Sequence, residues 1–82
     1  MELRQIRYFV AVAERENFTL AALTMHIVQS ELSTSIRQLE EKLGKALLIR
    51  FTRKVRLPLH GRPFLPLAQR FVDSVEQAVE EI

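Results

Sequence analysis

The stretch FTLAALTMHIVQSELSTSIRQLEEKLG, residues 18–44, decides the fold because it holds two helical patterns separated by a short break. In its second half, apolar side chains recur at helical intervals, at Leu32, Ile36, Leu39 and Leu43. This period places them in one stripe, which must be buried. Gly44 follows and can end the helix with a positive φ. The stretch therefore predicts a short helix, a turn and a longer helix.

The short helix is predicted to begin where Asn17 and Phe18 interrupt the apolar pattern. Thr19 is placed to act as its N-cap, because a hydroxyl there accepts a hydrogen bond from an unpaired backbone N–H. Ala21 and Ala22 are adjacent small residues, which allow another helix to cross closely. These features fit the first helix of a crossing helix pair.

The outward side of the longer helix is polar. Opposite the apolar stripe lie Ser30, Thr34, Arg37 and Glu41, and Ser33 lies at its margin. The start of a helix also presents unpaired N–H groups and the positive end of the helix dipole. We interpret this side as a surface that can meet an anion.

Further elements flank this pair. Residues 3–14 predict an amphipathic helix whose apolar stripe is Leu3, Ile6, Phe9, Val10 and Ala13, with Arg4, Tyr8 and Arg15 on its other side. Residues 47–50 and 54–57 predict two short strands. In the second strand, alternation puts Val55 and Leu57 inward and Lys54 and Arg56 outward.

Together these elements predict a mainly α fold, a winged helix-turn-helix of three helices and a two-stranded wing. In that architecture the second helix of the pair enters a major groove of DNA, and the wing contacts the backbone or a minor groove.

Positive charge is concentrated before residue 63. Residues 1–62 carry 11 Lys and Arg against 6 Asp and Glu, a net +5, whereas residues 63–82 carry a net −3. One basic block without acidic neighbours is Arg50, Arg53, Lys54, Arg56 and Arg62. Such a block is typical of a site for a polyanion, and the alternative is a solvated surface loop.

Length and composition limit the function classes. The 82 residues suit one small domain, and without cysteine there is neither a disulfide framework nor a thiolate metal site. No apolar run approaches the roughly 18 residues that span a bilayer, so we expect a cytoplasmic protein that does not insert into membranes. His26 and His60 are far apart, and no glycine-rich phosphate loop is present. We therefore expect no catalytic residue, metal or cofactor.

The last segment predicts a dimerisation helix. Apolar residues alternate at intervals of four and three to the chain end: Phe64, Ala68, Phe71, Val75, Ala78 and Ile82. A second stripe consists of Leu65, Val72 and Val79. One stripe can pack on the winged domain, and the other then needs a partner, which indicates a homodimer on a partly palindromic site. The alternative is an intramolecular helix that uses both stripes.

The segments MELRQIRYFVAVAERENFTLAA and RQLEEKLGKALLIRFTRKVRL, with Gly61, resemble the N-terminal DNA-binding domain of the bacterial LysR-type transcriptional regulators, without a gap over essentially the whole chain. The resemblance implies sequence-specific binding of double-stranded DNA by residues 1–58 and a linker helix over residues 59–82 that dimerises by antiparallel packing. It also implies that a whole regulator continues into a larger effector-binding domain, absent here, which would bind a small-molecule effector and support higher oligomers.

The resemblance places DNA contacts at residues of the longer helix and the wing, namely Gln29, Ser30, Ser33, Thr34 and Arg53. To these we add Thr19, Arg37, Arg50 and Lys54 as DNA-facing candidates. A glutamine can make a bidentate contact with adenine, and an arginine suits a narrow minor groove.

Several residues depart from the family pattern in the longer helix. Val28 stands where a capping serine is usual, so either Ser30 takes the cap or the helix start frays. Glu31 replaces a small residue and Thr34 replaces a common arginine, which predicts weaker DNA binding or a different preferred sequence.

Prolines depart from the pattern before the linker helix. Pro58 replaces a capping threonine, and Pro63 and Pro66 lie where the first turns should be. Since proline is tolerated only near a helix start, the helix is predicted to begin late, near Pro63, or to bend at Pro66.

Two rival functions remain open. One is a winged helix that binds protein without DNA, and the other is a small stand-alone repressor. DNA binding that releases counterions must weaken steeply with ionic strength, so a salt titration separates the first rival from DNA reading.

Overall fold

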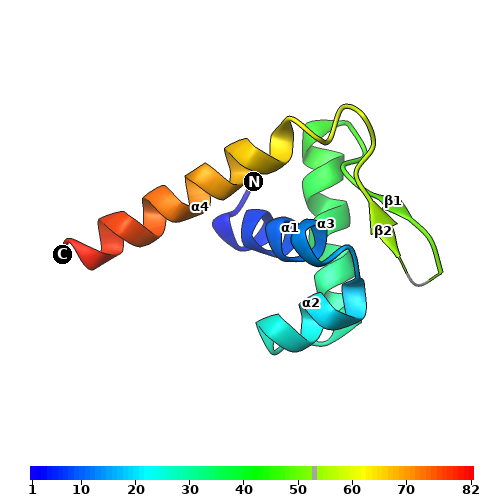
Figure 1. The fold of residues 1–82 in the computed structure, drawn as a ribbon, viewed down its shortest axis with the longest axis horizontal. Coiled ribbons are helices and arrows are strands. Elements are labelled where there is room, and N and C mark those ends of the chain that lie inside the picture. Colours follow the sequence, from blue (N-terminus) through cyan, green and yellow to red (C-terminus); the bar gives the residue numbers. More distant parts are fainter. Residues whose placement is uncertain (53) are drawn as a thin grey trace.

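The computed structural model describes residues 1–52 and 54–82 (Figure 1). Its elements follow in the order α1 (Leu3–Arg15), α2 (Phe18–Met25), α3 (Gln29–Leu43), β1 (Ile49–Arg50), β2 (Val55–Arg56) and α4 (Phe64–Glu80). The first three helices pack together, the β1–β2 hairpin projects beside α3, and α4 extends away from the group (Figure 1). The predicted winged helix-turn-helix followed by a long helix is confirmed.

Side chains and backbone at the helix ends explain where α2 and α3 begin and end. Asn17 caps α2, because its side chain accepts a hydrogen bond from Leu20 N at 2.9 Å. The prediction that Thr19 is the N-cap is wrong, since Thr19 already lies in the first turn. Val28 precedes α3 without a side-chain cap, and Ser30 does not replace it. Gly44 ends α3 with a φ of 72°, as predicted.

The core lies where α1 crosses α2 and α3. Phe9, Leu32, Ile36 and Leu39 are fully buried, and Ala21 lets the helices approach closely. α1 also packs against α4, so its buried arc is wider than one stripe. The prediction that Tyr8 faces outward is wrong, because Tyr8 is 8% exposed.

The wing strands are shorter than predicted. β1 and β2 pair antiparallel, with Ile49 opposite Arg56 and Arg50 opposite Val55. The predicted extension to Leu47 does not form a ladder, because Leu47 N donates to the Glu40 carboxylate at 2.7 Å instead. Within β2, Val55 is buried and Arg56 is exposed, as predicted.

α4 begins at Phe64, after a turn over residues 59–63, so the predicted late start near Pro63 is confirmed and a helix from residue 59 is not formed. Pro66 lies in the first turn, where its missing N–H leaves no helical hydrogen bond unmade. The Phe64 ring meets Phe9 edge-on at a centroid distance of 5.2 Å. The start of α4 therefore belongs to the core of the winged domain.

Candidate nucleic-acid interface

The outward side of α3 is not covered by the other residues that the structure describes. Gln29, Ser30, Thr34 and Arg37 are exposed, and Ser33 is half-buried between this side and the core. The apolar stripe of α3 turns the other way, into the core. The structure thus brings together the residues that the sequence assigned to the recognition helix.

Thr19 holds one of these residues. Its Oγ1 donates a hydrogen bond to Gln29 Oε1 at 3.1 Å, across the turn between α2 and α3. Because Oε1 accepts from Thr19, the Nε2 group is the end of the amide that can donate to a further partner. Thr19, which is not the N-cap that we predicted, therefore orients Gln29.

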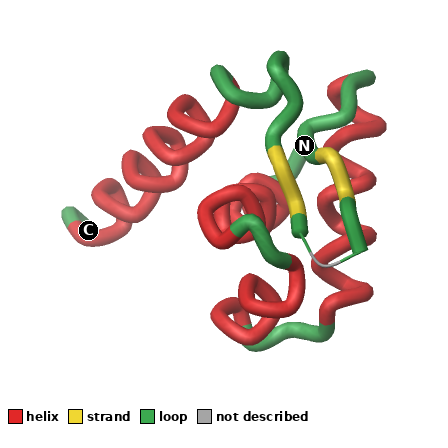
Figure 2. Tube along the Cα trace, turned by 45° about the vertical axis from the view of Figure 1, so that its right-hand side comes forward, coloured by secondary structure: helices red, strands yellow, loops and turns green. Residues whose placement is uncertain are grey.

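The wing lies beside α3 (Figure 2). A hollow of about 200 Å³ lies between them, and Thr19, Gln29, Ser33 and Lys54 are among its lining residues. An exposed lysine next to polar groups on a helix start favours an anionic ligand over a neutral one. This hollow joins the two parts of the predicted interface.

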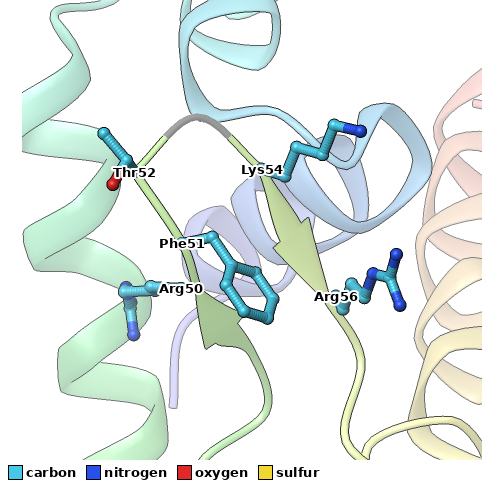
Figure 3. Close-up of a pocket in the computed structure, with 5 residues that line it drawn as sticks. All are labelled: Arg50, Phe51, Thr52, Lys54 and Arg56. Atoms are coloured by element: carbon cyan, nitrogen blue, oxygen red, sulfur yellow. The ribbon is translucent and has the colours of Figure 1, made fainter.

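Arg50 is turned away from solvent. Its Nη1 donates to Glu40 Oε1 at 3.1 Å, and its guanidinium carbon lies 5.3 Å from the centre of the Phe18 ring. The Arg50 side chain is 23% exposed, and Figure 3 shows it directed toward α3. Arg50 thus joins the wing to α3 through Glu40, and a DNA contact at Arg50 stays a prediction.

The outer face of the wing combines cations with apolar surface. An open hollow of about 810 Å³, shown in close-up in Figure 3, is lined by Arg50, Phe51, Thr52, Lys54 and Arg56. Phe51 is 56% exposed, and Ile49, two residues earlier on the same side of β1, is also exposed. Strand alternation could have revealed this apolar surface, which the sequence analysis overlooked. Arg53, the predicted wing contact, lies outside the described residues.

α4 divides the predicted dimer seam into two parts. Ala68 is buried against the core and Phe64 is partly buried there, so neither forms an open surface. Val75 is half-buried. The open apolar residues are Leu67, Phe71, Ala78, Val79 and Ile82. The sequence analysis placed Val79 in the second stripe and Leu67 in neither stripe, because helical spacing alone does not say which side of α4 the core takes.

No metal-binding cluster of His, Cys, Asp and Glu occurs among residues 1–52 and 54–82. Within the same residues, no helix is long and apolar enough to cross a bilayer. His26 ends α2 in the left-handed conformation with a φ of 58°, and the His60 ring bonds to the carbonyl of Ala46. Both histidines therefore have structural places in turns.

Comparison with known proteins links this geometry to a family. The description "Bacterial regulatory helix-turn-helix protein, lysR family" matches residues 3–62. The chain is 49% identical over 78 residues to the Hca operon transcriptional activator HcaR of Escherichia coli strain K12, a match that covers 95% of this chain and 26% of HcaR. The chain thus spans about a quarter of the length of that curated relative.

Solved structures agree with the family match. The BenM DBD/benA site 1 DNA complex superposes with a TM-score of 0.91 at 44% identity, covering 99% of this chain and 91% of that chain. The CbnR DBD–DNA complex superposes with a TM-score of 0.92 at 36% identity, covering 99% and 93%. Both of these similar chains are DNA-binding domains in complex with DNA.

Proposed function

The chain belongs to the LysR family of bacterial regulatory helix-turn-helix proteins, and from this premise we propose that it reads double-stranded DNA with α3 in the major groove and the wing at the minor groove. One observation carries the proposal: the polar side of α3 is open and lies next to the cationic wing. A protein-binding surface would not need this arrangement of hydroxyls, amide and cations on a helix of groove-fitting size.

Residue roles follow from exposure and chemistry. Gln29, held by Thr19, donates from Nε2 to an acceptor on a base edge. Ser30, Ser33 and Thr34 supply hydroxyls to bases or phosphates along the same side of α3.

Cations of α3 and the wing complete the interface. Arg37 on α3 and Lys54 on the wing are exposed and bind phosphates, which fixes the register of α3 in the groove. Arg53, at the tip of the wing by sequence, remains our candidate for the minor groove.

The exposed apolar face of α4 supports a homodimer. Phe71 is 47% exposed, and Ala78 and Ile82 continue the open surface toward the end of the chain. We place the DNA-reading unit at residues 1–58 and the linker at residues 59–82, of which α4 forms the helical part. Two copies joined through α4 present two recognition helices to two half-sites, so the preferred target is partly palindromic.

The wider context of the proposal is a regulator without catalytic chemistry that works in the cytoplasm, where bacterial DNA lies. The relatives HcaR and BenM are named as transcriptional regulators, and each is about four times longer than this chain. A small-molecule effector and any higher oligomer therefore belong to parts of a longer regulator beyond these residues.

Selection of bound duplexes from a random pool, followed by fluorescence anisotropy, tests the proposal. The selected duplex should bind at least tenfold tighter than a scrambled one, and the logarithm of the binding constant should fall linearly with the logarithm of salt concentration. Replacing Gln29 with Ala should reduce the preference for the selected duplex, while Gln77→Ala on the exposed end of α4 serves as the control. Binding without sequence preference or without salt dependence would overturn the proposal.

A further inference from the structure

Arg4 brings a cation to the side of α3 that lies away from the wing. It is the second residue of α1, and its side chain is 62% exposed. With Ser30, Glu31 and Thr34 it lines a hollow of about 340 Å³ between the start of α1 and the outward side of α3. Arg4 thus stands next to residues that we assign to the DNA groove.

Within the chain, the charge of Arg4 is held only by a weak, exposed ion pair among the described residues. Arg4 Nη2 lies 3.3 Å from Glu2 Oε2, and both side chains are 62% exposed. Water and salt screen such a pair, so it competes poorly with a phosphate. Glu31, in the first turn of α3, lies in the same hollow and repels phosphates.

Both hollows beside α3 are lined by cationic side chains: Arg50 and Lys54 on the wing side, and Arg4 on the α1 side. On the wing side, Lys54 lines the hollow with Gln29 and Ser33. On the α1 side, the cation that lines the hollow with Thr34 is Arg4. A helix in the major groove lies between two phosphate backbones, about 12 Å apart across the groove. A protein that docks there binds more tightly when it presents positive charge to both backbones.

We propose that Arg4 binds a backbone phosphate on the strand opposite the wing, and that its charge offsets the repulsion from Glu31. This contact rests on the proposed function, because it requires α3 to lie in the major groove. The ligand is a phosphodiester, read by charge, so the contact adds affinity without sequence preference. It also supplies, from α1, positive charge that the outward face of α3 lacks at Thr34.

Salt-dependent anisotropy of the full chain on its selected duplex tests this inference. Arg4→Gln should lower the slope of log binding constant against log salt concentration by about 0.9 for each bound chain. The loss in affinity should be equal on selected and scrambled duplexes. Arg70→Gln, which removes the same charge from the exposed side of α4, is the matched control and should leave the slope unchanged.

Arg4→Lys separates charge from folding. It should keep the wild-type slope, since a point charge is enough at a phosphate. An Arg4→Gln slope equal to that of Arg70→Gln, or an Arg4→Lys slope as low as that of Arg4→Gln, overturns the inference. Either result leaves DNA reading by α3 intact, whereas a wild-type chain without salt-dependent binding would refute the proposed function itself.

Discussion

Glu40 is the residue that attaches the wing to α3, so replacing it should loosen this attachment. Its carboxylate accepts hydrogen bonds from Leu47 N at 2.7 Å, Leu48 N at 3.2 Å and Arg50 Nη1 at 3.1 Å. The Glu40 side chain is 12% exposed, so all three donors meet it largely out of water. Among residues 1–52 and 54–82, Arg50 Nε and Nη2 are buried without a hydrogen-bond partner, so Glu40 is the acceptor there that compensates this guanidinium.

Replacing Glu40 with Ala leaves a partly buried charge and two backbone donors unsatisfied. Breaking a buried ion pair from one side costs about 3–5 kcal/mol, and the lost amide bonds act in the same direction. The whole domain is stable by about 4–12 kcal/mol at this length. We therefore expect the free energy of unfolding to fall by about 3–5 kcal/mol. Arg50→Met should cost less, because Glu40 keeps both backbone donors.

Urea unfolding followed by circular dichroism measures both effects. Glu41→Ala, one residue along α3 and exposed, is the control and should change the free energy of unfolding by less than about 0.5 kcal/mol. The reasoning fails if Glu40→Ala and Glu41→Ala have the same midpoint, or if Arg50→Met is the more damaging change. Either result would mean that the carboxylate is not what holds the wing to α3.

Three further predictions concern the turn before α4, the dimer and base reading. A Cβ at Gly61 would lie 2.8 Å from Leu47 O, so Gly61→Ala should lower the thermal midpoint by several degrees in a melting experiment. Phe71→Asp places a charge on the open face of α4 and should convert a dimer to a monomer in light scattering, with an unchanged far-ultraviolet spectrum; a persistent dimer would contradict our seam. Thr19→Val removes the hydrogen bond to Gln29 Oε1 and should change the base preference found in duplex selection, while Thr19→Ser should keep the wild-type preference. An identical selected sequence for the wild type and both variants would refute the orienting role of Thr19.

Local patterns predicted most of the fold. The stripe from Leu32 to Leu43 fixed α3 and its inward side, and Gly44 marked its end, because both depend on helix geometry within a few residues. The late start of α4 followed from proline chemistry at Pro63 and Pro66. These properties need no knowledge of distant contacts.

Tertiary contacts account for the failures. Tyr8 is buried although it lies outside the apolar stripe of α1, because the elements packed on α1 cover more than that stripe, and the sequence of α1 does not contain those partners. The sequence analysis took Arg50 for a free cation in a basic block. In the structure Arg50 donates to Glu40, which lies ten residues earlier in the chain. Asn17 and Thr19 both suit a helix start, and only the backbone at residue 17 decides between them.

The candidate site was predicted in part. Exposure of Ser30, Thr34 and Arg37 followed from the wheel position opposite the stripe, whereas Gln29 was assigned from the family resemblance. Arg4 could not be found this way, since its neighbours in space are on α3, far along the chain. The exposure of Phe51 was also not predicted, because the sequence analysis considered only the charges of the basic block around it.

The contact between Phe9 and Phe64 has a consequence for how α4 melts. The first turns of α4 pack in the same core as α1, whereas every residue from 76 onward is exposed in the single chain. Amide protons near Ala68 should therefore exchange at the rate of global unfolding, and those of the last turn at the rate of local fraying. One continuous helix thus spans two cooperative units, and a second copy of the chain would extend slow exchange toward its end.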